Sequence, residues 1–119
     1  MRAQRGDVVF VDFPFSDRAG SKIRPALVVQ CDQNNRRLDD TIVVAITSRK
    51  RFAATEATQL LIEVSSVAGK QTGLLYDSAV QCENIVTIDN SFVIRRIGSF
   101  DAGLMQRVAL CLKASLQLS

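Results

Sequence analysis

The sequence predicts a mainly β domain in which five or six short strands are followed by one C-terminal helix. Short apolar runs rich in β-branched residues recur along the chain, and turn-forming residues separate them. In the last segment of the chain, apolar residues recur with helical spacing instead. At 119 residues the chain has the size of one domain, and we see no repeat, linker or low-complexity tract within it. We therefore expect a single domain over residues 1–119.

The first half of the chain supplies three predicted strands, each bounded by turn-forming or polar residues. The first strand mixes β-branched and aromatic residues and ends at Pro14. Pro25 favours an extended conformation for Arg24 and leads into the second strand, which is continuously apolar. The third strand is also continuously apolar and ends at Thr47. The strands cover residues 6–13, 26–31 and 41–46, and the loops between them cover residues 14–23 and 32–40.

The second half of the chain supplies three more strands and the helix. The fifth strand is expected to kink near Asn84, and Gly98 closes the sixth. Asp101 is the expected N-cap of the helix, because its carboxylate can accept hydrogen bonds from free backbone N–H groups of the first turn. Apolar side chains then alternate with polar ones at helical spacing up to Leu116. These three strands cover residues 59–64, 79–87 and 92–97.

This order of elements favours a small antiparallel barrel of the SH3-like sort, mainly β with a C-terminal helix. An open sheet covered by the helix is the competing architecture.

Cys31, Cys82 and Cys111 are widely spaced and lie in apolar stretches. We therefore expect them to be reduced thiols of the core rather than a disulfide framework.

The composition of the chain excludes several classes of protein. There is no histidine, so the usual general acid and base near neutral pH is missing, as is the commonest zinc ligand. With no CxxC motif and no clustered carboxylates, we expect no metal site. No apolar run approaches the roughly 18 to 20 residues of a membrane helix, and the N-terminus lacks the apolar core of a signal peptide. We expect a cytoplasmic protein with no membrane segment.

The net charge of +3 and the pI near 9.0 permit an anionic partner without demanding one. The basic residues gather beside turn-like residues rather than inside the apolar runs. If the fold brings these loops to one face, they form a track for a phosphate backbone, and otherwise they are solvated loop charges. The basic groups are Arg18, Lys22 and Arg24, then Arg36 and Arg37, then Arg49, Lys50 and Arg51.

Two positions stand out as candidates for chemistry. Arg24 lies at the entrance of one buried strand, and Thr47-Ser48 lies at the exit of another, so adjacent strands could bring them together. An arginine offers a planar fork of donors that matches a phosphate, and a nearby hydroxyl can hold a non-bridging oxygen. The alternative is that an Arg before Pro and a Thr at a strand end are ordinary surface features.

Longer motifs in the same regions resemble the MazF/PemK family of toxins. The segment from Arg5 to Phe13, followed by the segment from Lys22 to Val29, carries the closest resemblance. Glycine and Arg-Pro motifs in this order are fairly specific together, although each alone is weak. Further matches in register are residues 45–48, 72–75, 78–80, 82–89 and 95–98 and the C-terminal helix, so the resemblance covers nearly the whole chain.

The resemblance implies the toxin of a toxin-antitoxin pair. Such a toxin is a homodimeric SH3-like barrel, of the sort also seen in CcdB-like proteins, that cleaves single-stranded RNA such as mRNA unless a cognate antitoxin occupies its groove. No cofactor is implied. Family members typically leave a 2′,3′-cyclic phosphate and a 5′-hydroxyl, as expected when the 2′-hydroxyl of the substrate is the nucleophile. That chemistry suits a chain without histidine, because the enzyme orients the ribose and stabilises the pentavalent phosphate.

The resemblance also implies site residues, which we assign by matching each family position to a position of this chain. Arg24 and Thr47 match the principal catalytic Arg and Thr of the family, with Arg24 bracing the phosphate charge and Thr47 binding its oxygen, and Ser48 would assist. Glu83 falls where some members place an acid proposed as general base, and the alternative is a structural ion pair. The residues expected to bind RNA are Arg18, Lys22, Arg49, Lys50 and Gln81.

The chain also departs from the family pattern. Gln81 and Val86 stand where some relatives have Arg. Arg18 stands where some relatives use His, and because the pKa of an arginine is far higher, Arg18 is a poor proton shuttle. Two alternatives to a nuclease therefore stay open. One is a toxin of the same fold that poisons DNA gyrase by binding, and the other is an RNA- or protein-binding barrel without activity.

Overall fold

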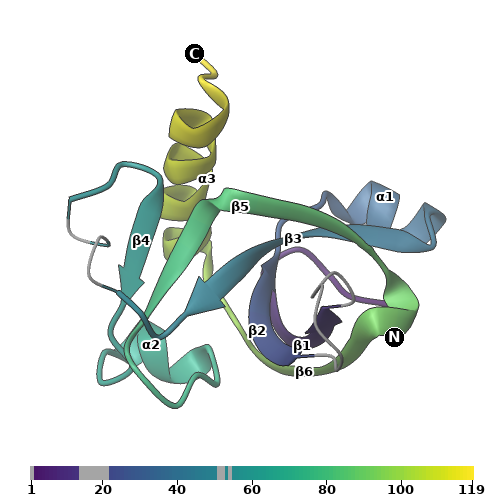
Figure 1. Ribbon diagram of the computed structural model, residues 1–119, viewed down its shortest axis with the longest axis horizontal. Helices are drawn as coiled ribbons and strands as arrows, with labels where there is room; N and C mark the ends of the chain where they lie inside the picture. The colour runs from purple at the N-terminus through teal and green to yellow at the C-terminus, as the bar shows by residue number, and fades with distance from the viewer. Residues whose placement is uncertain (1, 14–21, 51–52, 54) are drawn as a thin grey trace.

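The computed structural model describes residues 2–13, 22–50, 53 and 55–119, and its main feature is a six-stranded antiparallel sheet. The strand order is β4-β5-β3-β2-β1-β6. The sheet curls into a partly open barrel, with the helix α3 against its β4 and β5 side (Figure 1). This confirms the predicted mainly β fold with a C-terminal helix. The strands are β1 (Asp7–Phe13), β2 (Lys22–Val28), β3 (Asp40–Thr47), β4 (Gln59–Ile62), β5 (Ser78–Asp89) and β6 (Val93–Ser99).

All six predicted strands are present, with shifted boundaries. β2 begins at Lys22 instead of residue 26, because Lys22 and Ile23 pair with Phe13 and Asp12 of β1. The predicted loop over residues 14–23 is therefore shorter, and its residues 14–21 lie outside the described residues. The kink expected near Asn84 is confirmed: the register with β3 jumps from Ile85 to Gln81, which leaves residues 82–84 as a bulge.

Two short helices were not predicted from the sequence. The polar segment 32–40, expected to be a loop, contains α1 (Asp32–Arg37). Its Asn35 is buried, and the Oδ1 atom of Asn35 accepts hydrogen bonds from Gln30 Nε2 (2.9 Å) and Thr41 Oγ1 (2.7 Å). This internal network holds a sequence that has no apolar face of its own. The second helix, α2 (Val67–Gln71), is capped by Ser66, whose Oγ accepts from the backbone N of Gly69 at 2.9 Å.

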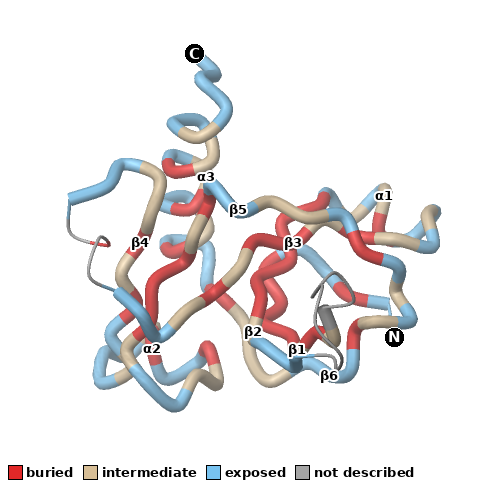
Figure 2. The backbone as a smooth tube through the Cα atoms, viewed as in Figure 1, coloured by how far each residue is buried: buried red, intermediate tan, exposed pale blue. Residues whose placement is uncertain are grey.

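The sheet buries side chains on both faces, which explains why its central strands read as continuous apolar runs. Successive residues alternate between two clusters, as strand geometry requires. One cluster lies under α3 and includes Val8, Leu27 and Val44, whereas their neighbours Val9, Val28 and Val43 belong to the other, inside the curl. The buried positions follow the middles of the strands and the inner side of α3 (Figure 2).

The C-terminal helix α3 (Ala102–Leu116) begins where the sequence predicts. Asp101 caps it, with its Oδ1 accepting from the backbone N of Leu104 at 2.8 Å. Leu104, Val108 and Cys111 are buried along one side, at the predicted helical spacing. A 3-10 turn (Asn90–Phe92) precedes β6. In the part of the chain that the structure describes, no helix has the length and apolarity needed to cross a bilayer.

The Arg5-Gly6-Asp7 motif, part of the resemblance noted above, has a structural role. Asp7 is buried, and its carboxylate accepts from Arg96 Nε at 2.9 Å and from the backbone N of Gln4 at 2.9 Å. The Arg5 guanidinium donates to the carbonyl of Val29. Gly6 has a φ of 94°, a conformation that favours glycine. The motif thus ties the N-terminus to β2 and β6.

The prediction of three core thiols is confirmed for Cys82 and Cys111 and wrong for Cys31. Cys82 and Cys111 are buried between β5 and α3. Cys31 is exposed, because it lies at the N-cap position of α1, where the chain has already left the sheet. All three cysteines are free thiols.

This difference predicts selective alkylation. Burial raises the pKa of the Cys82 thiol to about 12, and burial also raises the pKa of Cys111. Because the thiolate is the reactive form, iodoacetamide at pH 8 should label Cys31 in the folded protein and leave the other two unlabelled. Peptide mass spectrometry before and after addition of guanidinium chloride measures this. Labelling of Cys82 in the native protein, at the rate seen for Cys31, would contradict the buried placement.

Candidate active site

The candidate active site lies where β2 and β3 separate. These strands pair only at Ala26–Val28 with residues 43–45, and Ala26 pairs with Ala45 at the end of the ladder. Arg24 of β2 and Thr47 of β3 each lie two residues beyond this last pair, where the strands are no longer paired. A pocket of about 600 Å³ opens at this point, and both residues line it. The structure therefore brings Arg24 and Thr47 to the lining of one pocket.

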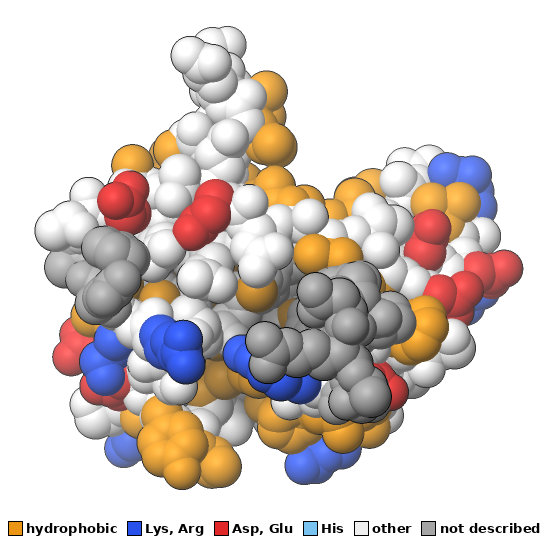
Figure 3. Space-filling view, in the orientation of Figure 1, with side chains coloured by type: hydrophobic (Ala, Val, Ile, Leu, Met, Phe, Trp, Pro, Cys, Tyr) orange, Lys and Arg blue, Asp and Glu red, His pale blue; other side chains and the backbone are white. Residues whose placement is uncertain are grey.

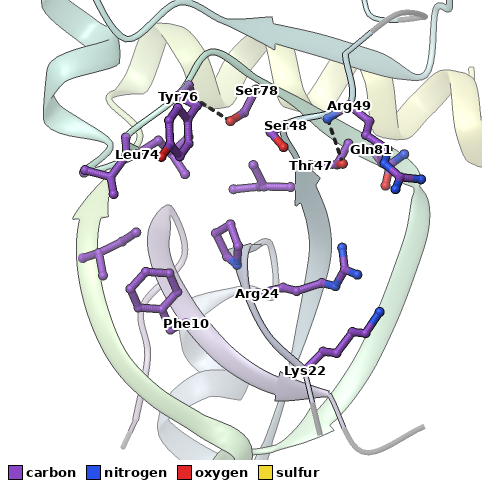
Figure 4. Close-up of a pocket in the computed structure, with 15 residues that line it drawn as sticks. Phe10, Lys22, Arg24, Thr47, Ser48, Arg49, Leu74, Tyr76, Ser78 and Gln81 are labelled. Carbon is purple, nitrogen blue, oxygen red and sulfur yellow. Dashed lines mark hydrogen bonds between the residues drawn. The ribbon is translucent and has the colours of Figure 1, made fainter. Parts of the chain in front are cut away.

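One wall of the pocket is polar and cationic. Three of its side chains are basic, and among the described residues that line the pocket none is acidic. Cations that share one concavity raise the local concentration of anions, and low-dielectric walls strengthen the effect. This wall is built from the start of β2, the end of β3 and the middle of β5, and its residues are Lys22, Arg24, Thr47, Ser48, Arg49 and Gln81 (Figure 4).

The Thr47 hydroxyl is held by the turn that follows β3. The backbone N of Arg49 donates to Thr47 Oγ1 at 3.1 Å. A hydroxyl that accepts in this way keeps its own hydrogen for another acceptor, and here that hydrogen can point to an anion in the pocket. Arg24 of β2 and Arg49, which follows the end of β3, are both exposed and line the same pocket, so both guanidinium groups are available to an anion there. The geometry suits a phosphate group better than any neutral ligand.

Most of the other lining residues are apolar. They come from β1, β2, β3 and β6 and from the segment between α2 and β5, namely Phe10, Pro25, Ile46, Leu74, Leu75, Tyr76 and Ile97. Figure 4 shows Tyr76 and Leu74 across the hollow from Thr47, Arg49 and Gln81. On the surface, basic and large apolar side chains lie side by side along the lower edge of the view in Figure 3. The pocket therefore has one cationic side and one apolar side.

Two of the described residues that were predicted from the sequence, Glu83 and Lys50, do not line this pocket. Glu83 lies in the β5 bulge, and its Oε2 accepts from Gln59 Nε2 at 2.7 Å. Lys50 follows Arg49 but is not among the lining residues. Arg18 lies outside the described residues. Sequence reasoning in turn missed the apolar wall, and the signal that pointed to it was the run Leu74-Leu75-Tyr76, apolar residues in a segment otherwise made of turn formers.

Comparison with solved structures defines the class of protein. The fold matches an endoribonuclease in complex with its cognate antitoxin from a mycobacterial species, with a TM-score of 0.78 and 22% identity over 98% of this chain and 97% of that one. It also matches the Mycobacterium tuberculosis toxin MazF-mt6, with a TM-score of 0.76 and 22% identity over 95% and 98% of the two chains. The curled sheet with its C-terminal helix is thus a MazF-like fold.

Sequence comparison then gives the family. The chain is 34% identical to endoribonuclease EndoA of Bacillus subtilis, over 99% of this chain and 97% of that protein. It is 32% identical to endoribonuclease MazF6 of M. tuberculosis, over 99% and 100%. Residues 4–116 match the family described as PemK-like, MazF-like toxins of type II toxin-antitoxin systems. The chain belongs to this family.

Proposed function

We propose that this chain is a toxin domain that cleaves single-stranded RNA without a metal ion or cofactor. The observation that carries the proposal is that Arg24 and Thr47, from different strands, line one cationic pocket, to which the part of the chain that the structure describes contributes no carboxylate. The names of its relatives, which are endoribonucleases, support the same activity. Its substrate would be mRNA in the cytoplasm.

The proposed reaction uses the substrate's own 2′-hydroxyl. The 2′-oxygen attacks the adjacent phosphorus as the 2′-hydroxyl proton leaves, and the bond from phosphorus to the 5′-oxygen breaks as that oxygen gains a proton. The products are a 2′,3′-cyclic phosphate and a 5′-hydroxyl. Arg24 stabilises the extra negative charge of the pentavalent phosphate, and Thr47, assisted by Ser48, donates to a non-bridging oxygen. Lys22, Arg49 and Gln81 hold the neighbouring backbone, with Arg18 and Lys50 as the remaining RNA-binding residues expected from the sequence.

The candidate general base that the sequence offers is Glu83. Its Oε2 accepts from Gln59 Nε2, which leaves lone pairs of the carboxylate available, but Glu83 does not line the pocket. To accept the 2′-hydroxyl proton, its side chain would have to turn toward the pocket when RNA binds. Without Glu83, water accepts the proton and the enzyme contributes through orientation and charge alone.

The decisive experiment is cleavage of a single-stranded RNA in the presence of EDTA, with the end groups mapped. We expect cleavage to survive the chelator and to leave cyclic phosphate and 5′-hydroxyl ends. Binding of RNA without cleavage would instead indicate an inactive RNA-binding barrel. The absence of both, together with inhibition of DNA gyrase, would indicate a gyrase poison, which needs neither Arg24 nor Thr47. Either result contradicts the nuclease proposal.

The proposal includes two protein partners. One is a cognate antitoxin that blocks the pocket, a partner supported by the mycobacterial endoribonuclease of the same fold, which forms a complex with its cognate antitoxin. The other is a second copy of the chain, because a small domain gains buried surface by pairing. Sedimentation at micromolar concentration should show a dimer, and a monomer at every concentration up to about 100 micromolar would contradict it.

A further inference from the structure

The two walls of the pocket differ in chemistry in the way that the two parts of a nucleotide do. A nucleotide joins an anionic phosphate to a base with a flat apolar face. The cationic wall, with Arg24 and Arg49, matches the phosphate. Leu74 and Tyr76 lie across the hollow from it (Figure 4), and Leu75, between them in the chain, also lines the pocket. The cationic wall alone accounts for cleavage. The apolar wall needs a separate explanation.

Tyr76 and Leu75 are unusually exposed for side chains of their size. Tyr76 is 70% exposed and Leu75 is 81% exposed, although both line a pocket. A flat aromatic side chain presented to solvent beside cations is the arrangement that proteins use to stack the bases of single-stranded RNA. The Tyr76 ring also carries a hydroxyl, which can stay hydrated while its face is covered.

The backbone that carries Tyr76 is fixed on both sides. Before it, the buried Thr72 donates from Oγ1 to the carbonyl of Gly69 at 2.6 Å. After it, Ser78 Oγ donates to the carbonyl of Tyr76 at 2.7 Å, and Asp77 Oδ1 accepts from the backbone N of Val64 at 2.9 Å. The exposure of Tyr76 is therefore imposed by a well-bonded turn. Little ordering is needed when a ligand covers it.

Phe10 is a weaker candidate for the same role. It lines the pocket, but it is half-buried, and the guanidinium of Arg95 lies 5.2 Å from the centroid of its ring. That cation already covers one face of the ring. Tyr76 is the aromatic side chain of the pocket wall with the larger free surface.

We infer that Tyr76 is a stacking platform for a base of the single-stranded RNA whose phosphate occupies the cationic wall. This inference rests on the proposed function and adds a determinant of substrate binding to it. Stacking accepts any base, so Tyr76 sets the position and affinity of the strand rather than a strict sequence. The competing explanation, a patch that contacts a protein, is an outcome of the test.

Tyr76 can be observed directly, because the chain has one tyrosine and no tryptophan. The probe is a short RNA in which 2′-O-methyl groups block cleavage. We expect its titration to quench the tyrosine fluorescence of the protein in a saturable way, after correction with N-acetyltyrosinamide in the same RNA for light absorbed by the bases. An abasic strand with the same number of phosphates should bind more weakly and give no quenching.

Variants separate stacking from charge. Tyr76→Ala should weaken binding of the blocked RNA about tenfold, within the range measured when a stacking aromatic side chain is removed. Tyr76→Phe should stay within about twofold of wild type, because it keeps the ring. The matched control is Leu110→Ala, which shortens an exposed apolar side chain elsewhere, on α3. This variant should leave binding of the blocked RNA unchanged.

The outcomes distinguish this inference from the nuclease proposal. Saturable quenching without cleavage of unmodified RNA would support the platform and contradict the nuclease. Cleavage of unmodified RNA by both wild type and Tyr76→Ala at equal rates, with no quenching by the blocked strand, would overturn the platform and leave the nuclease intact. Weaker binding of a partner protein by Tyr76→Ala, at unchanged RNA affinity, would also overturn the platform.

Discussion

Replacing Arg24 with Ala is expected to lower the rate of RNA cleavage about 100-fold or more, the cost typical of losing one main donor to a transition-state oxyanion. Arg24 lines the same pocket as Thr47, and a guanidinium can donate to two phosphate oxygens at once. A single-turnover measurement on a short RNA isolates the chemical step from product release. Arg24→Lys keeps the positive charge but loses the planar pair of N–H donors of the guanidinium. Its rate should therefore lie between those of wild type and Arg24→Ala.

The matched control for this prediction is another exposed arginine. Arg37 lies on α1, outside the pocket, and donates to Asn34 Oδ1 at 3.0 Å. Arg37→Ala removes the same charge and should change the rate by no more than about twofold. If Arg37→Ala and Arg24→Ala lose activity equally, the effect of Arg24 is general electrostatic attraction, and its catalytic assignment fails.

Arg24 and Thr47 should also depend on each other. If both bind the same phosphate, the double variant loses less activity than the product of the two single losses, because residues that act as a unit are non-additive. Independent, multiplicative losses would mean that the two side chains act on different groups of the substrate.

The strands and the helix could be predicted from the sequence because their signals are local. Apolar runs, the turn residues between them and the Asp101 cap each act within a few residues. The helix α1 could not be predicted in this way. It depends on Asn35, whose hydrogen-bond partners Gln30 and Thr41 precede and follow the helix and come together only in the folded chain. A polar segment that folds around an internal network looks like a loop in the sequence.

The same distinction applies to the candidate site. Arg24 and Thr47 could be proposed because they lie near the ends of two strands, β2 and β3, that pair with each other and bring both residues to one pocket. The apolar wall could not be proposed, because its position depends on a contact between the end of α2 and β6. Gly73, at a φ of 75°, lies against the backbone of Ile97, and Gly98 lies against the backbone of Thr72. Only the folded chain shows that Tyr76 faces the cations.

That contact makes the second large prediction, which concerns Gly98. A Cβ atom at Gly98 would lie 2.3 Å from the carbonyl carbon of Thr72 and 2.5 Å from the carbonyl oxygen of Gln71. Both are backbone atoms, so the clash cannot be relieved by rotating a side chain. Gly98→Ala should therefore lower the free energy of unfolding by about 3 kcal/mol, at the upper end of overpacking effects. For a chain of this size that corresponds to a fall in Tm of about 10 °C or more, measurable by circular dichroism.

Gly103→Ala is the matched control, because it makes the same chemical change in a helix. A Cβ atom at Gly103 would meet only Asp101 Oδ1, at 3.5 Å, which is an ordinary contact. Alanine also has the higher helix propensity, so the Tm of Gly103→Ala should be unchanged or slightly raised. Equal stability of the two variants would contradict the close packing of the α2 end on β6.

At a temperature where both variants are folded, Gly98→Ala should also bind blocked RNA more weakly, because the displaced turn carries Leu74, Leu75 and Tyr76 away from the cationic wall.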